Sequence, residues 1–314
     1  MKRGELFVFG AVLLALIALS RVLPDYSLEL ATRIAIFALF AMSLDLMVGY
    51  TGLASLGHAA FFGIAGYAVG LLALGGASAT LIVPLALAVA LVVSLVFAAL
   101  SLRATGVYFL MLTLALAQIV WGLAYQWRSF TGGDDGLPGI ARTAFGEVRF
   151  SEPSSFLLLT AGCFVAAAVL LLLIVRSPFG LGLQGIRESP TRMAALGYNV
   201  WLHRYIASNI AALFAGLAGM LHAWHNGIVT PGQMGLVTSA EALLMVILGG
   251  AGTIIGPMIG ALVIVLVEFL VNRYTERWVS VLGAIYILVV VAAPQGLYAP
   301  LRAHGVRLFH RVTK

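Results

Sequence analysis

Long apolar runs, separated by short polar or glycine- and proline-containing segments, fill most of this 314-residue chain. An α-helix rises about 1.5 Å per residue, so about 20 apolar residues cross the roughly 30 Å hydrocarbon core of a bilayer. Measured with that length, the pattern predicts helices over residues 6–23, 28–49, 56–74, 79–100, 106–126, 155–175, 204–225, 240–254, 257–271 and 279–293. The sequence therefore predicts an all-α, polytopic membrane protein with about ten transmembrane helices, some of them short or broken.

Glycine interrupts the apolar pattern at residues 49–57 and again at 249–252, where the flanking runs are short enough to be half-helices. Non-helical backbone at membrane depth is tolerated only where protein or a water-filled cavity satisfies its polar groups. A path for a solute is therefore expected near the first break, although helix–helix hydrogen bonding explains the polar residues of 106–126 equally well. The candidate lining residues are Tyr50, Thr51, Ser55, His58, Tyr108, Thr113 and Gln118.

Composition and charge exclude several classes of protein. Charged residues make up only 10% of the chain, against about a quarter in a soluble domain. The net charge of +6 comes from Lys and Arg in short loops and in the tail 301–314, not from a basic, aromatic-interleaved face for nucleic acid. Apart from Arg273 and Arg277, these cations place both termini on the cytoplasmic side. The loop 128–154, slightly richer in acidic residues, then lies outside.

Catalytic and cofactor signatures are missing from the sequence. No Walker-type phosphate loop and no recognisable catalytic grouping occurs, so an enzyme is not expected, and any ATPase must be another polypeptide. The lone Cys163 and the pair His222 and His225 fall short of the ligand set that zinc needs. We expect one transmembrane domain over residues 1–314, with no metal and no cofactor bound by this chain.

The loop 177–203 predicts two short surface helices. Ser177-Pro178 breaks the preceding helix, and Ser189-Pro190 starts another with serine at the N-cap and proline at the first helical position. Gly197 provides the stop of the second helix. From these residues alone, an ordinary structured loop and a rigid knob on the cytoplasmic surface are both open.

Several motifs, in order along the chain, resemble the membrane permeases of branched-chain amino acid ABC importers. They include Ser-Pro-Phe-Gly at 177–180, Ile-Arg-Glu at 186–188 and Ala-Ala-Leu-Gly-Tyr at 194–198. The resemblance continues at 50–67, 103–109, 113–118, 131–137, 247–257 and 294–297, and is closer to the second of the two permeases of such importers. One position departs: Leu53 stands where the family usually has Gln, which puts the substrate in doubt.

The resemblance implies the partners and the role of the loop. It implies a homologous permease, two cytoplasmic ATPase subunits that hydrolyse ATP, an external solute-binding protein, and a multi-pass location in the cell inner membrane. Residues 180–197 would seat in a groove of the ATPase. The loop residues implied are Gly180, Ile186, Arg187, Glu188, Arg192, Ala194, Ala195 and Gly197. The alternatives are a permease for urea or short amides, and a secondary carrier that needs no ATPase.

Four ionisable residues fall within apolar runs: Asp45, His58, Glu241 and Glu268. Such groups usually face a bundle interior. Asp45 is either a structural partner of the broken backbone or part of the path, and His58 is either a core histidine or a wall of the path. Glu241 is expected at an interface, and Glu268 is expected to reach toward water. These residues look too scattered for a proton relay.

Overall fold

The computed structural model describes residues 3–22, 24–142, 144–145 and 148–272, with separate residues between 280 and 298. This part of the chain is helical except for four two-residue strands. The long helices are α1 (Arg3–Val22), α2 (Asp25–Asp45), α3 (His58–Leu74), α4 (Ala79–Ser101), α5 (Val107–Gln126), α7 (Pro153–Arg176), α10 (Val200–Asn226), α11 (Leu236–Gly249) and α12 (Ile255–Val271).

Each of these nine helices coincides with one of the predicted apolar runs, so the all-helical membrane fold is confirmed. Five helical segments are long and apolar enough to span a bilayer: 25–51, 79–101, 107–126, 153–176 and 200–226. The helices α3, α11 and α12 are apolar but shorter. Of the tenth predicted run, 279–293, only residues 280, 281, 283, 284 and 287 are described, and the tail 301–314 lies entirely outside the described residues.

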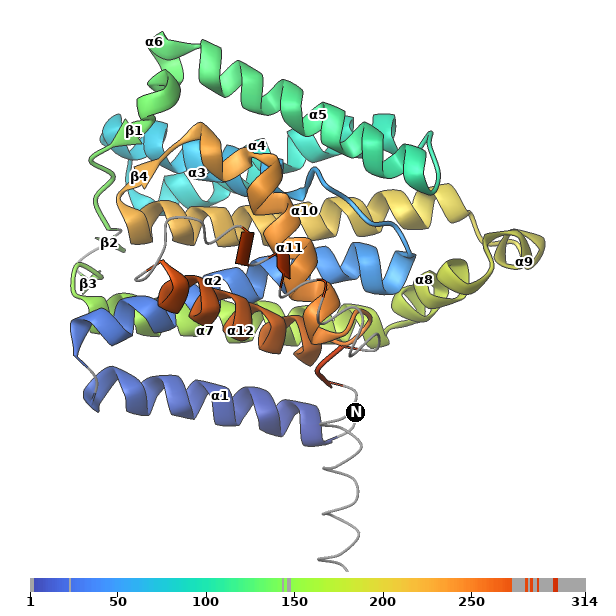
Figure 1. The fold of residues 1–314 in the computed structure, drawn as a ribbon, viewed down its shortest axis with the longest axis horizontal. Helices are drawn as coiled ribbons and strands as arrows, with labels where there is room; N and C mark the ends of the chain where they lie inside the picture. Colours follow the sequence, from blue (N-terminus) through green and yellow to red (C-terminus); the bar gives the residue numbers. More distant parts are fainter. Residues whose placement is uncertain are drawn as a thin grey trace, which may run out of the picture.

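The helix α2 lies in the interior of the bundle, where it packs against α7, α10 and α12 (Figure 1). The buried share of the most apolar 18-residue stretch is 89% in 25–51, 33% in α4 and 22% in α5. The helices α4 and α5 therefore turn most of their apolar surface outward. In a bilayer that surface meets lipid or another membrane chain.

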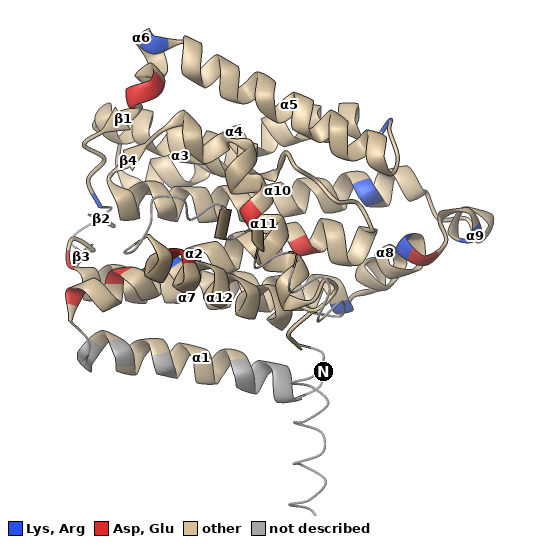
Figure 2. Ribbon diagram, in the orientation of Figure 1, with Lys and Arg blue, Asp and Glu red and all other residues tan. Residues whose placement is uncertain are grey.

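The two ends of the bundle differ. At one end lie α8 (Pro178–Glu188), α9 (Pro190–Ala195) and the start of α1 (Figure 1). At the other end lie α6 (Arg128–Thr131), η2 (Gly133–Asp135) and the strands β1 (Leu137–Pro138), β2 (Ala144–Phe145), β3 (Val148–Arg149) and β4 (Ile228–Val229). Strand β1 pairs antiparallel with β4, and β2 with β3. The first pairing ties the long loop to the segment that leads through η3 (Pro231–Met234) into α11. Figure 2 shows charged residues mainly at these two ends, with few in the middle of the bundle.

Both predicted breaks in the helices are confirmed. The helix α2 continues into a π-helix, η1 (Leu46–Thr51), which ends at Gly52 with φ +75°. The helix α11 ends at Gly249, and α12 begins five residues after Gly250, whose φ is +110°. A Cβ placed on Gly249 would meet the backbone of Gly256, so these two helices pack backbone against backbone.

The two predicted surface helices, α8 and α9, are also confirmed. Ser177 Oγ accepts from the Gly180 N–H at 3.3 Å, and Ser189 Oγ accepts from the Arg192 N–H at 3.3 Å. The helix α10 starts four residues before the predicted residue 204, because Asn199 caps it through a 3.0 Å bond from the Leu202 N–H. Arg204 therefore lies in the second turn of α10 and not at its start.

Candidate functional site

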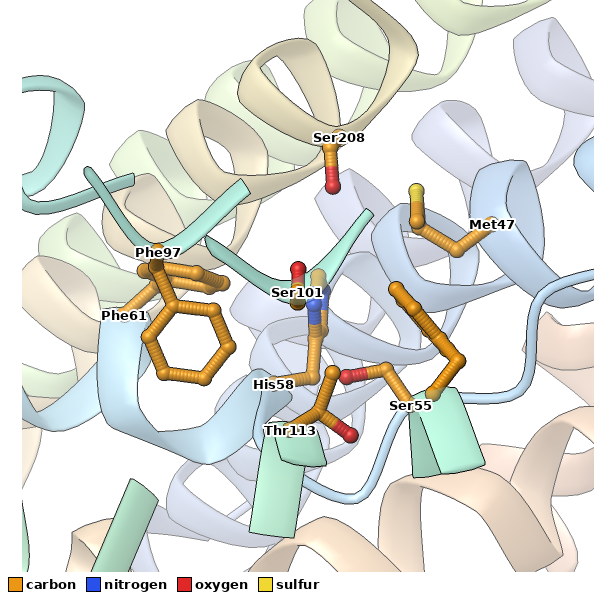
Figure 3. Close-up of a pocket in the computed structure, with 9 residues that line it drawn as sticks. Met47, Ser55, His58, Phe61, Phe97, Ser101, Thr113 and Ser208 are labelled. Atoms are coloured by element: carbon orange, nitrogen blue, oxygen red, sulfur yellow. The ribbon is translucent and has the colours of Figure 1, made fainter. Parts of the chain in front are cut away.

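A pocket lies where the broken connection between α2 and α3 meets α4, α5 and α10 (Figure 3). Its unfilled space is about 250 Å³ when open solvent at the mouth is counted, and the enclosed part is about the size of one water molecule. Its lining residues are Met47, Ser55, His58, Phe61, Phe97, Ser101, Phe109, Thr113 and Ser208. The predicted break in the backbone therefore does border a cavity, whose wall combines aromatic rings with hydroxyl groups.

His58 is fixed in the pocket wall by a hydrogen bond and by ring stacking. Its Nε2 lies 2.8 Å from Ser43 Oγ, and its ring stacks on Phe40 at 5.5 Å between centroids. The single Ser43 hydroxyl proton goes to the Phe40 carbonyl oxygen at 2.6 Å. Since a hydroxyl has one proton, the His58 Nε2–H must be the donor to Ser43. His58 is thus both a satisfied core histidine and a residue of the pocket wall.

The helices α5 and α11 satisfy the backbone of the broken segment. Thr113 Oγ1 accepts from the Leu56 N–H at 3.2 Å, and Ser239 Oγ accepts from the Ala59 N–H at 3.1 Å. A Cβ on Gly57 would meet the Thr113 carbonyl, so glycine permits the close approach to α5. Side chains of neighbouring helices thus supply the hydrogen bonds that lipid does not.

The predicted path residues separate into three groups. Ser55, His58 and Thr113 line the pocket together. Tyr50 and Thr51 are buried in η1, where Thr51 Oγ1 donates to the Met47 carbonyl at 2.7 Å. Tyr108 and Gln118 are exposed on the outward face of α5. Leu53, the departure from the family pattern, is buried and is not among the lining residues.

Sequence reasoning missed four polar residues of the pocket and its support: Ser43, Ser101, Ser208 and Ser239. Ser43 and Ser101 have apolar neighbours on both sides, and Ser208 and Ser239 each have one polar neighbour, so no recurring spacing singles them out. Serine is also common at helix contacts in membranes, where it hydrogen-bonds to a neighbouring helix. The only usable signal was the closeness of Ser43 to Asp45 before the predicted break.

Asp45 serves the structure of the two helix breaks. Its Oδ1 accepts from the Gly252 N–H at 2.8 Å, so the carboxylate joins the end of α2 to the segment between α11 and α12. A Cβ on Gly49 would meet both the Asp45 carboxylate and the Gly252 backbone. The structural alternative for Asp45 is therefore the one that the geometry bears out.

The sequence predicts that the Glu268 carboxylate reaches toward water, but in the structure it does not. It forms a 2.6 Å ion pair with Arg33, and only 9% of its side chain is exposed. Glu241 is buried as well and interacts electrostatically with both members of the pair. Residues from α2, α11 and α12 are thus less scattered than the sequence implied, and they form a polar cluster inside the bundle.

His222 is buried within the bundle. Its Nε2 pairs with Asn226 Nδ2 at 2.9 Å, and its ring contacts Phe37 and Phe62. Within the described residues, no group of three or more His, Cys, Asp or Glu side chains is arranged to hold a metal ion.

The loop residues implied by the resemblance divide between the interior and the surface. Gly180 and Ile186 are buried inside the chain, as is the neighbouring Leu183. Glu188, Arg192, Ala194, Ala195 and Gly197 are exposed. Arg187 is exposed too, but its Nη1 donates to the Gly49 carbonyl oxygen. The outward surface of the loop is therefore mainly α9 and the turn that follows it.

Comparison with known proteins gives one family across most of the chain. Residues 26–292 match the family described as "Branched-chain amino acid transport system / permease component". The high-affinity branched-chain amino acid transport system permease protein LivM of Salmonella typhimurium is 28% identical over 94% of this chain and 75% of its own length. The LivM protein of Escherichia coli is 27% identical over the same shares.

Two other kinds of relative match over shorter stretches. The Escherichia coli permease protein LivH of the same transport system is 33% identical over 43% of this chain and 44% of its own length. A guanosine ABC transporter permease protein of Bacillus subtilis, NupQ, is 28% identical over 35% of this chain and 34% of its own length. No solved structure matches this chain.

Proposed function

We propose that this chain imports a branched-chain or other hydrophobic amino acid, because it belongs to the family of permease components of branched-chain amino acid transport systems. The chain is a membrane permease and not an enzyme, and ATP is hydrolysed by partner subunits of such a system. The proposal concerns the solute, the residues that meet it, and the surfaces that meet the partners.

The composition of the pocket is the observation that carries the choice of solute. Phe61, Phe97 and Phe109 offer apolar faces for an aliphatic side chain. The hydroxyls of Ser55, Ser101 and Thr113 offer hydrogen bonds to a carboxylate or an ammonium group. A zwitterion with an aliphatic side chain uses both kinds of wall, whereas urea has no group for the aromatic one. The lining therefore favours a hydrophobic amino acid over urea or a short amide.

The outward face of α5 is where we place the homologous permease. Tyr108 is 77% exposed, and the exposed Gln118 lies on the same face. A glutamine facing hydrocarbon is unfavourable, so a partner chain or a water-filled path is the better neighbour for it. Each permease would then contribute half of the translocation path. In this chain, that half would be formed by a single transmembrane domain, residues 1–314.

The two ends of the bundle fit the remaining partners. The segment 177–203, with α9 at its tip, faces one of two cytoplasmic ATPase subunits, and both chain termini lie on that side. The loops 132–152 and 227–238, joined by the pairing of β1 with β4, face the external solute-binding protein. The exposed Leu181, Leu196 and Arg192 provide the apolar and charged contacts that a docking groove needs.

Uptake of labelled leucine tests the proposed function. Cells that carry the complete transport system, with or without this chain, are compared before and after ATP depletion at a maintained membrane potential. We expect chain-dependent uptake that stops when ATP is depleted. Uptake that persists without ATP would identify a secondary carrier, and chain-dependent uptake of urea in place of leucine would overturn the choice of solute.

Filling the pocket should stop transport. Ser101 is 1% exposed and lines the pocket, so S101F places an aromatic ring in the space for the solute. We expect leucine uptake to fall about tenfold or more, since misplacing a bound group by even 1 Å has effects of that size or larger. The matched control is L100F, because Leu100 is on the same turn of α4 and is 42% exposed. Equal uptake by the two variants would contradict the assignment of the pocket.

A further inference from the structure

Three interrupted elements meet around Gly49. The guanidinium of Arg187, in the last turn of α8, donates to the Gly49 carbonyl oxygen in η1. The Gly252 N–H, between α11 and α12, donates to Asp45 Oδ1 at the end of α2. The surface loop and the two helix breaks therefore meet at one place in the structure.

Glycine is required at this meeting point. A Cβ on Gly252 would stand 3.0 Å from Arg187 Nη1 and 3.1 Å from the Gly49 oxygen. A Cβ on Gly52 would stand 3.1 Å from Arg187 Cγ. Both glycines also have positive φ, +83° and +75°. The backbone is thus shaped to admit the Arg187 side chain between the two breaks.

The carboxylate of Asp45 has one oxygen that the rest of the described chain leaves without a hydrogen bond. Oδ1 accepts from the Gly252 N–H, and the backbone of Thr253 also interacts with the carboxylate, but Oδ2 is buried and has no hydrogen bond of normal geometry among the described residues. Arg187 carries five N–H donors and interacts electrostatically with Asp45. A second acceptor for the same guanidinium therefore lies close to the first.

The contact also reaches the pocket. Gly49 is two residues after Met47, which lines the pocket and whose carbonyl accepts from the Leu53 N–H at 3.0 Å. Ser55 and His58 follow in the same irregular connection. Displacing the Gly49 peptide therefore displaces the pocket wall. On its other side, α8 is anchored in the bundle by Leu183 and Ile186, both fully buried.

We propose that Arg187 is a positioning residue that transmits movement of α8 to the pocket by exchanging its guanidinium between the Gly49 carbonyl and Asp45 Oδ2. The proposal rests on the coupling role of α8 and α9. When the ATPase shifts α8, the arginine leaves the Gly49 peptide and pairs with the carboxylate. The π-helical segment is then released, and the wall carrying Ser55 and His58 changes position. Two discrete acceptors give two states in place of a continuous deformation.

The test uses the complete transporter in proteoliposomes with its binding protein and leucine, and measures ATP hydrolysis and leucine uptake in parallel. We expect R187Q and D45N to keep at least half of the hydrolysis while uptake falls about tenfold or more, a size typical of coupling between sites. D45N keeps one oxygen as acceptor for Gly252, but it removes the charge and replaces the acceptor Oδ2 with an NH2 group, which donates. R187K retains the charge without the two-pronged geometry, so an intermediate loss of uptake is expected. The control is R103Q, since Arg103 is exposed on the same side and lies outside this contact.

Two results would overturn the exchange. Normal uptake by D45N would show that the carboxylate acts only as a cap for Gly252. A parallel loss of hydrolysis and uptake in R187Q and R187K would show that Arg187 only stabilises the fold. Failure of the proposed function itself is distinguishable, because the unmodified transporter would then show no ATP-driven leucine uptake.

Discussion

Replacing Gly49 with alanine is expected to destabilise the permease by about 3 kcal/mol, the upper end of the usual range for overpacking. The new methyl group would meet the Asp45 carboxylate and the backbone of Gly252. A flexible side chain can move aside at little cost, but Gly252 is held at φ +83° between two packed helices. The clash therefore has to displace the break between α11 and α12.

The measurement for G49A is the free energy of unfolding by SDS titration in mixed micelles, with leucine uptake as a second readout. The matched control is G162A, because a Cβ at Gly162 in α7 meets no heavy atom within 4 Å. Alanine there should be neutral or stabilising by up to about 1 kcal/mol, since glycine in a helix interior is unfavourable. Wild-type stability of G49A would refute the close approach of the two breaks.

Removing the Glu268 carboxylate is expected to cost about 1.5–3 kcal/mol, because the Arg33 guanidinium, whose side chain is 32% exposed, would lose its charged hydrogen-bond partner. The 2.6 Å pair joins α2 to α12, and the Glu268 side chain is only 9% exposed. We expect E268A to unfold at a markedly lower SDS fraction, and E268Q to lie between it and the unmodified chain. The double variant R33L/E268L should recover much of the loss, since an apolar pair often replaces a buried ion pair without cost.

The second ion pair of the described chain supplies the matched control. Arg142 and Glu29 lie 2.9 Å apart, but half of the Glu29 side chain is exposed. Water screens such a pair, so E29A should cost about 1 kcal/mol or less. Equal losses from E268A and E29A would contradict the burial of the Arg33–Glu268 pair.

Local patterns in the sequence were sufficient to predict where the helices lie and where they are interrupted. An apolar run long enough for the bilayer has few alternatives to a helix, because lipid offers no hydrogen bonds to an exposed backbone. For the same reason glycine-rich interruptions at 49–57 and 249–252 marked real breaks. The serine–proline pairs at 177–178 and 189–190 marked the starts of α8 and α9, because the capping geometry is set within one turn. The motifs along the chain also indicated the family that the comparisons show.

The tertiary structure decided which side chains meet. Arg33 and Glu268 are 235 residues apart, and no local pattern pairs them. An all-apolar helix also carries no amphipathic signal for its inward face. The sequence therefore placed Ser55, His58, Tyr108, Thr113 and Gln118 in one path, whereas of the three predicted path residues on α5 only Thr113 lines the pocket.

The same distinction applies to the surface loop. The sequence by itself determined that two short helices with capped starts lie at 177–197, since those features depend on neighbouring residues. Only the packing of α8 against the bundle decided that Ile186 points inward and that Arg187 reaches Gly49. Local backbone chemistry sets where a helix begins and ends, but the direction of its side chains follows from packing, which for Arg187 includes a contact with Gly49, 138 positions away.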